Sequence, residues 1–228
     1  MTIRKMTLEE GRKGASLFTV AARKIMGESL LTTTLYGSAV RGEFNEETSD
    51  VNMIFIASRL GLSVYEELAS PVQNAKEDFR LAPLFVEKDE LLRFALHYPV
   101  RYLDILSYYE VIFGDDLLAR YRPDNSIIKE KAFHELIDIK LEMRRSLLNG
   151  LPNAFMLARS QRTFLPKILC IVRVLTETSG LHERAAIGAI LPALQDMRKM
   201  LLSDDLETLK TLYIRLFTAI DRLLDILK

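Results

Sequence analysis

The spacing of hydrophobic residues along the chain changes near residue 120 and divides the sequence into two parts. Before it, short apolar runs typical of strands alternate with amphipathic stretches typical of helices. These runs predict strands at 29–36, 51–57 and 80–86, and helices at 8–26 and 63–79. After Arg122-Pro123-Asp124, apolar residues recur three and four positions apart, which indicates helices. We therefore expect an α/β domain with a mixed sheet over 1–120 and an all-α helical bundle over 121–228.

Local signals place the ends of the N-terminal elements. Thr7-Leu8-Glu9-Glu10 and Ser63-Val64-Tyr65-Glu66 are capping boxes that start the two helices. The first helix is expected to be amphipathic, with Leu8, Leu17, Phe18, Ala21 and Ile25 on one side. The strand at 51–57 is apolar at almost every position, which predicts burial on both faces. The segment 100–113 is ambiguous, with a helical turn followed by a strand-like run.

The C-terminal half contains four predicted helices with short breaks between them. They are expected over about 124–149, 153–178, 183–201 and 205–227, with Asp204 or Asp205 capping the last. The first carries Phe133, Ile137, Leu141 and Leu148 at helical spacing. Asn149-Gly150-Leu151-Pro152-Asn153 breaks the pattern with a helix-ending Gly and a following Pro. Short connections of this kind favour an antiparallel bundle.

The stretch LYGSAVRGEFNEETSDVNMIFI, residues 35–56, carries the candidate chemistry. Gly37-Ser38 follows the first strand, and glycine lets a ligand approach the main chain closely. Backbone N–H groups beside the Ser38 hydroxyl are suited to hold a phosphate. Asp50 and Asn52 open the next strand two positions apart, so both side chains are expected on one face. A phosphate cradle facing oxygen ligands is what metal-assisted phosphoryl or nucleotidyl transfer requires.

This stretch resembles the active-site signature of the nucleotidyltransferase superfamily, which includes DNA polymerase beta and kanamycin nucleotidyltransferase. In that family a Gly-Ser turn precedes a strand that carries two acidic residues with one residue between them. Small bacterial members often read Gly-Ser-x-x-Arg-Gly before Ser-Asp, as residues 37–42 and 49–50 do here. The resemblance implies the family's fold, an NTP–Mg²⁺ ligand, Ser38 on the distal phosphates and Asp50 on the metal. Kanamycin nucleotidyltransferase also has a helical bundle after its catalytic sheet.

The chain departs from the family pattern in its carboxylates. Asn52 stands where the second acidic residue is expected, and it would be a neutral metal ligand. The strand at 80–86, where a third carboxylate is expected, has no acidic residue before Glu87. Losing one charge about 4 Å from another costs on the order of 4 kcal/mol at a partly wet site. Glu43, Glu46, Glu47 and Glu87 are the candidate replacements.

Each candidate also has a plain structural interpretation. Gly37-Ser38 and Asp50 also suit a hairpin turn and the start of a strand. Arg41 is a candidate phosphate ligand, because a planar guanidinium binds oxyanions in a bidentate manner, and it is equally well explained as a solvated loop arginine. The basic stretch at 140–173, with Arg159 and Arg162 on one helical face, suits either an anion site or a solvated bundle surface.

Composition excludes several classes of function. Lys plus Arg and Asp plus Glu each number 31, so no overall field attracts nucleic acid or an anionic membrane. The one cysteine, Cys170, lies in an apolar run and is expected to be a buried structural thiol in a reducing compartment. No signal peptide or transmembrane segment is predicted. These observations favour a soluble, cytoplasmic protein.

The sequence thus predicts a nucleotidyltransferase-like protein that binds NTP and weakly held Mg²⁺. Nucleotide-binding residues are expected to be Gly37, Ser38 and Arg41, with Asp50 and Asn52 as catalytic and metal-binding residues. Transfer of a nucleotidyl group to a small molecule or protein is one outcome, with catalysis impaired by the incomplete carboxylates. The alternative is a catalytically inactive nucleotide-binding or regulatory module on the same fold. A homodimer through the helical bundle, with the sheet domain as a scaffold, stays open.

Overall fold

A computed structural model describes residues 5–150, 153–200 and 205–228. The chain forms two compact units, one of Met1–His97 with Tyr102–Arg122 and one of Tyr98–Arg101 with Pro123–Lys228. The fold class is confirmed, since a mixed sheet with helices precedes a set of helices. The boundary at residue 120, as a division between independent domains, stays a prediction.

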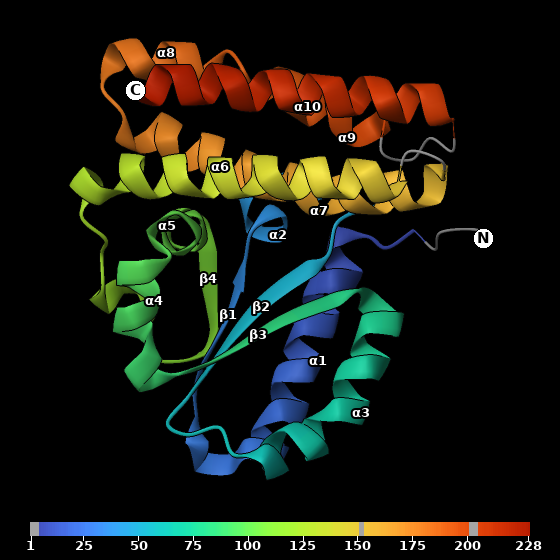
Figure 1. Ribbon diagram of the computed structural model, residues 1–228. Helices are drawn as coiled ribbons and strands as arrows, with labels where there is room; N and C mark the ends of the chain where they lie inside the picture. The colour runs from blue at the N-terminus through green and yellow to red at the C-terminus, as the bar shows by residue number, and fades with distance from the viewer. Residues whose placement is uncertain (1–4, 151–152, 201–204) are drawn as a thin grey trace. The chain divides into compact units, whose positions relative to one another are not determined.

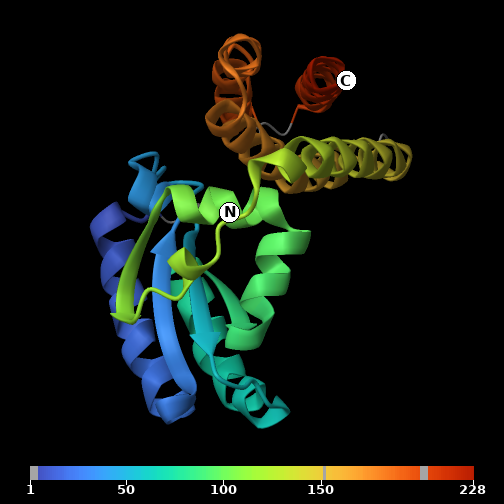
Figure 2. The same cartoon turned by 90° about the vertical axis from the view of Figure 1, so that its left-hand side faces the viewer.

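The first unit is built on a four-stranded sheet in the order β3-β2-β1-β4. Its strands are β1 (Leu30–Tyr36), β2 (Val51–Ala57), β3 (Leu81–Glu87) and β4 (Tyr109–Gly114). β1 pairs antiparallel with both β2 and β4, whereas β2 and β3 are parallel. The end of β1 therefore meets the beginnings of the other three strands at one edge of the sheet (Figure 2).

Helices cover both faces of this sheet. α1 (Leu8–Met26) and α3 (Leu62–Phe79) pack with Val51, Met53 and Phe55 in one core cluster. α4 (Leu91–His97) and part of α5 (Pro99–Ser107) pack with Ile54 and Ile56 in another. Figures 1 and 2 show α1 and α4 on opposite sides of the strands. β2 is thus buried on both faces, as its uninterrupted apolar sequence predicted.

Two details of the helices differ from the sequence prediction. The Thr7–Glu10 capping box of α1 is confirmed, but Leu17 is 62% exposed, and the buried face instead runs through Gly11, Gly14, Phe18 and Ala22. Two small glycines let α1 lie close to its neighbours, which turns the larger Leu17 away from the core. α3 begins at Leu62 with Gly61 as its N-cap, so the predicted Ser63–Glu66 capping box is wrong.

The second unit consists of helices that pack lengthwise, with α6, α7 and α10 side by side in Figure 1. Its helices are α6 (Asn125–Gly150), α7 (Ala154–Thr178), α8 (Leu181–Gly188), α9 (Leu191–Met200) and α10 (Leu206–Leu227). Asn153 caps α7 and Asp205 caps α10, as predicted. Leu151, Pro152, Leu201 and Asp204, which also entered the predictions, lie outside the described residues.

Two predictions for this unit are wrong. The helix expected at 183–201 is two helices, and Pro192 lies in the first turn of the second, α9, where its missing N–H costs no helical hydrogen bond. Cys170 is half-buried rather than fully buried, with its Sγ 4.0 Å from the Val100 carbonyl oxygen. The helix expected at 124–149 is confirmed as α6, and its residues Ile137, Leu141 and Leu148 are exposed.

Buried hydrogen bonds tie these helices together. The Tyr213 hydroxyl of α10 donates to the Met143 carbonyl oxygen of α6 at 2.7 Å. Gln161 of α7 donates from Nε2 to the Leu209 carbonyl oxygen of α10 at 2.6 Å. Within the described residues, no helix is both long and apolar enough to cross a membrane.

Gly14→Ala is expected to destabilise the protein by about 1–3 kcal/mol, because an added Cβ overpacks the contact between α1 and α3. That Cβ would lie 2.5 Å from Cγ of Phe79. The helix propensity of alanine offsets only about 1 kcal/mol of this cost. Urea denaturation of parent and variant measures the difference.

Gly188→Ala is the matched control, since its Cβ would meet nothing closer than Cγ2 of Thr176 at 3.9 Å. This variant should be neutral or slightly more stable than the parent. Equal stability of the two variants would contradict the close packing of α1 against Phe79.

Candidate functional site at the edge of the sheet

The predicted site residues come from segments that meet where β1 ends. Tyr36, the last residue of β1, lies opposite Asn52 of β2 and Tyr109 of β4. Val51 of β2 lies opposite Leu81 of β3. We call this end of the sheet the Gly37 edge, defined by Gly37, Ser38, Asp50, Asn52, Arg80 and Tyr108.

The Gly-Ser turn is the start of a one-turn helix, α2 (Ser38–Arg41). Gly37 has a φ of 78°, which a residue with a side chain rarely adopts. Its N–H donates to the Tyr108 carbonyl oxygen at 3.1 Å, and its own carbonyl oxygen accepts from Val40 and Arg41. Ser38 is 7% exposed in the first position of this helix. The turn is therefore fixed between β1 and β4.

Asn52 lies directly against this turn. A Cβ placed on Gly37 would be 3.4 Å from Nδ2 of Asn52, which is van der Waals contact, so the amide lies immediately beside the turn. Asn52 is half-buried within β2, whereas Asp50 comes just before the strand and is exposed. The structure thus brings Gly37, Ser38 and Asn52 together, with Asp50 at the margin of the same edge.

The carboxyl group of Asp50 has an unusual electrostatic environment. Although the residue is exposed overall, surrounding protein atoms displace water from its carboxyl group, and this loss of hydration raises its pKa above the ordinary 3.8. The positive charge of Arg80 opposes the shift. Burial dominates, so the ionised form of Asp50 is held at a cost in free energy.

Arg80 is a residue of this edge that the sequence prediction treated only as the start of a strand. It ends α3 with a φ of 52°, the one positive φ of a non-glycine residue in the described parts of the chain. Its Nη2 donates to the Glu46 carbonyl oxygen at 2.7 Å, and its own carbonyl oxygen accepts from Val51 N–H at 3.0 Å. Arg80 therefore links the loop before Asp50 to the first residue of β2. A single arginine before an apolar run gives no sequence signal for this role.

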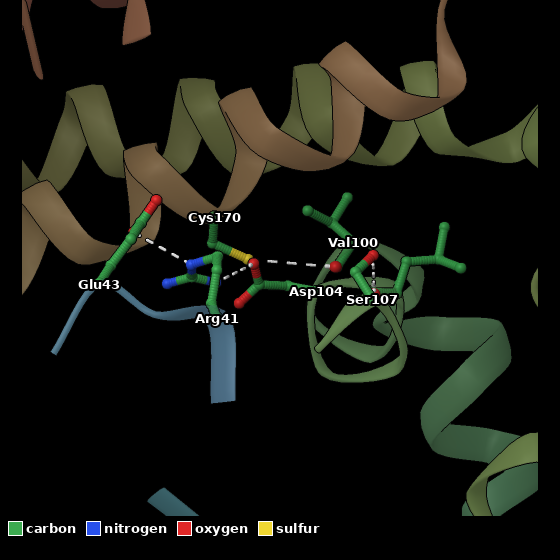
Figure 3. Close-up of polar contacts among 7 residues, drawn as sticks. Arg41, Glu43, Val100, Asp104, Ser107 and Cys170 are labelled. Carbon is green, nitrogen blue, oxygen red and sulfur yellow. Dashed lines mark hydrogen bonds and ion pairs between the residues drawn. The ribbon is translucent and has the colours of Figure 1, made fainter. Parts of the chain in front are cut away.

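Arg41 is neither a solvated loop residue nor an open phosphate ligand in this structure. Its side chain is 8% exposed, and its Nε lies 3.0 Å from the Glu43 carboxylate. Its Nη1 lies 3.7 Å from Asp104 (Figure 3). Its guanidinium group lies over the Tyr108 ring at 5.5 Å. Asp104 and Tyr108 come from the segment 100–113, whose ambiguous pattern gave no basis for placing them beside Arg41.

Three of the four candidate replacement carboxylates have other partners. Glu43 pairs with Arg41, and Glu47 lies 3.1 Å from Nζ of Lys5. Glu87 lies opposite Ala57 at the other end of β2, where it accepts from the Leu60 N–H at 2.6 Å. On β3, the residue opposite Asn52 is Ala82. Among the described residues, no three His, Cys, Asp or Glu side chains are grouped to hold a metal ion.

The basic stretch of the second unit is partly neutralised by acidic side chains. Lys140 pairs with Asp221, and Nζ of Lys167 lies 3.8 Å from Glu142. Arg159 is exposed. These contacts lie within the helical unit and favour the interpretation of a solvated bundle surface.

Comparison with known proteins supports the fold. No protein-family model matches this sequence, and no curated protein matches it either. The structure is similar to that of the spectinomycin adenyltransferase AAD(9) from Enterococcus faecialis, solved with ATP and spectinomycin. The TM-score is 0.52 and the sequence identity 16%, over 92% of this chain and 99% of that chain. The nucleotidyltransferase-like fold implied by the sequence resemblance is thus confirmed.

Asp50→Asn is expected to raise the melting temperature at neutral pH. The pKa of Asp50 is higher in the folded protein than in the unfolded chain. The protein therefore has its full stability below the unfolded pKa, where Asp50 is neutral, and loses stability as the pH rises through the folded pKa. The neutral amide escapes that loss. Melting curves in metal-free buffer should therefore converge below pH 3.8 and separate above it.

Asp205→Asn provides a control of opposite sign. Hydrogen bonds from Thr208 lower the pKa of Asp205, so this carboxylate contributes stability above its unfolded pKa and loses it as the pH falls. Its replacement should lower the melting temperature at neutral pH. A lower melting temperature for Asp50→Asn at pH 7 would contradict the environment described for Asp50.

Proposed function

We propose that this protein binds a nucleoside triphosphate at the Gly37 edge. The observation that carries the proposal is the contact between the Gly37 turn and Asn52, on a fold similar to that of an adenyltransferase solved with ATP. A backbone turn with positive φ, a helix start and oxygen-bearing side chains at one edge suit a polyphosphate. Gly37 and Ser38 would contact the distal phosphates.

Asp50 and Asn52 would hold a single, weakly bound Mg²⁺. Mg²⁺ prefers oxygen ligands and often uses one or two carboxylates together with substrate phosphates. One carboxylate and one amide oxygen fit that pattern for one ion. When bound, the ion would supply positive charge to the phosphates. Two ions would need further carboxylates, and the described residues offer no group of three potential ligands.

Transfer of a nucleotidyl group to a small molecule or a protein is the enzymatic form of this proposal. The structural neighbour was solved with a nucleotide and a small molecule together, which supports an acceptor of the same size class. The equal numbers of acidic and basic residues give no general attraction for nucleic acid. Catalysis is expected to be impaired, because Asn52 stands where a carboxylate is expected and β3 has no acidic residue before Glu87.

The second candidate is a nucleotide-binding module without transfer activity. It is favoured because two of the candidate replacement carboxylates are not free beside Asp50. Glu43 pairs with Arg41, and Glu87 lies opposite Ala57 at the far end of β2. Nucleotide binding needs fewer charges than transfer does, because transfer requires stabilisation of the charge that develops in the transition state. The two candidates share one site and differ in turnover.

Calorimetry with ATP, GTP, CTP and UTP should detect weak binding of at least one nucleotide, with Mg²⁺ increasing the affinity. Asp50→Ala should abolish the Mg²⁺ dependence, because it removes the only carboxylate assigned to the ion. Arg59→Ala is a control that removes a charge from the loop after β2, at the opposite end of the sheet. Absence of heat with all four nucleotides at millimolar concentration would refute the proposal.

Asn52→Asp should lower the stability of the ligand-free protein and increase the stabilisation given by Mg–NTP. Two carboxylates at 50 and 52 repel each other without a cation, whereas Mg²⁺ gains from a second anionic oxygen. Ligand-induced stabilisation follows the affinity, so thermal melts with and without Mg–NTP measure both effects. Asn45→Asp, in the loop before β2, controls for the added charge alone.

The same variants separate the two candidate functions. If Asn52→Asp shows no larger ligand-induced shift than the parent, Asn52 does not face a metal site. If the shift increases but labelled NTP transfers no label to any acceptor, the protein is a binding module that has lost transfer. We expect this second result, because the substitution restores one carboxylate while β3 still has no acidic residue before Glu87.

A further inference from the structure

Helix α6 has apolar residues on two faces, and only one of them is buried. The buried face packs within the helical unit, and its five residues are between 0% and 4% exposed. They are Ile128, Ala132, Leu136, Ile139 and Met143. A helix at the surface of a globular unit needs only one such face.

The second face forms the outer stripe of α6, which we define as Phe133, Ile137, Leu141 and Leu148. Phe133 is half-buried, and the others are 36%, 55% and 79% exposed in that order. At about 100° per residue, this stripe lies roughly 145° around the axis from the buried face. Single exposed apolar residues are ordinary, but Phe133, Ile137 and Leu141 follow one another at four-residue steps, and such a row marks an interaction surface.

Opposite charges lie toward the two ends of the outer stripe. Glu130 is on the same side of the helix before Phe133, and Arg144 is on that side between Leu141 and Leu148. Both are exposed, and neither forms an ion pair within residues 5–150, 153–200 and 205–228. The stripe therefore has an acidic end, an apolar middle and a basic end.

We propose that the outer stripe of α6 packs antiparallel against the outer stripe of a second copy of this chain. With Ile137 near the two-fold axis, Phe133 of one copy lies opposite Leu141 of the other, since each is four residues from Ile137. Glu130 then lies opposite Arg144, since each is seven residues away. The pattern is self-complementary, as an isologous two-fold interface requires.

Charge decides whether the two copies of α6 pack parallel or antiparallel. In a parallel arrangement Glu130 would face Glu130 and Arg144 would face Arg144, and both pairs repel. The antiparallel arrangement converts both into attractive pairs. This inference rests on the helical unit alone and is independent of nucleotide binding.

The size of the stripe predicts a modest affinity. α6 has 26 residues and is therefore about 39 Å long. A standard interface buries about 800 Å² on each partner, with 20–30 residues a side, and one helical stripe supplies fewer residues than that. A dissociation constant in the micromolar range is expected, so the dimer should appear only as the protein concentration increases.

Sedimentation velocity from about 1 µM to about 500 µM tests the proposal and should show a monomer converting to a dimer. Leu141→Glu should weaken dimerisation at least about a hundredfold, because two leucines per dimer lose their burial. Leu181→Glu is the matched control, since Leu181 is 86% exposed on α8 outside the stripe and should leave dimerisation unchanged. Circular dichroism confirms folding, which neither exposed substitution should disturb.

Charge reversal tests the antiparallel register. Glu130→Lys and Arg144→Glu should each weaken the homodimer about tenfold, because each creates two repulsive pairs. An equimolar mixture of the two variants should form heterodimers with parental affinity, since both pairs across that interface are again attractive. Distinct fluorescent labels on the two variants report the heterodimer directly.

A parent that stays monomeric at the highest concentration would overturn the proposal. So would a dimer that Leu141→Glu leaves unchanged, because it would use another surface. A mixture of the charge variants that gains no affinity over either variant alone would overturn the antiparallel register.

Discussion

The antiparallel pairing of β1 with β2 is the constraint on which the candidate site depends. It sets Tyr36 opposite Asn52 and so brings the Gly37 turn against the Asn52 amide. A slip of one residue would turn every side chain of β2 to the opposite face. β2 cannot slip without loss, because Met53 and Phe55 fill one core while Ile54 and Ile56 fill the other. The two cores therefore hold the geometry of the Gly37 edge.

Within that geometry, arginines supply positive charge beside the carboxylates. Arg80 reduces the cost of ionising Asp50, and Arg41 lies between Glu43 and Asp104. A guanidinium group is a fixed cation with directed N–H donors, whereas Mg²⁺ requires several oxygen ligands in octahedral geometry. Glu43 and Asp104 thus share an arginine partner, whereas the ionised form of Asp50 is still held at a cost in free energy.

The sequence predicted the sheet well because its strands are short, apolar and bounded by turn residues. The bounds of β2 matched the prediction, and the resemblance around Gly37 and Asp50 correctly implied the fold. It could not predict the surroundings of Arg41, because Asp104 and Tyr108 reach it from a segment whose local pattern suits both helix and strand. Nor could it predict Arg80, since the role of this residue arises from a left-handed backbone and contacts with Glu46. Both contacts are distant in sequence, and helical or strand periodicity reports only local preference.

Helix α6 shows what periodicity leaves undecided. Its sequence contains two apolar stripes, and the spacing of Phe133, Ile137, Leu141 and Leu148 predicted the helix without indicating which stripe is buried. The structure buries the other, because Met143 there brings its carbonyl oxygen to the Tyr213 hydroxyl while small Ala132 permits close packing. Spacing cannot rank two stripes of similar hydrophobicity, since the choice depends on the shapes of the neighbouring helices. The outer stripe of α6 still gains free energy if it is buried. In the proposed dimer, Glu130 and Arg144 of one copy pair with Arg144 and Glu130 of the other.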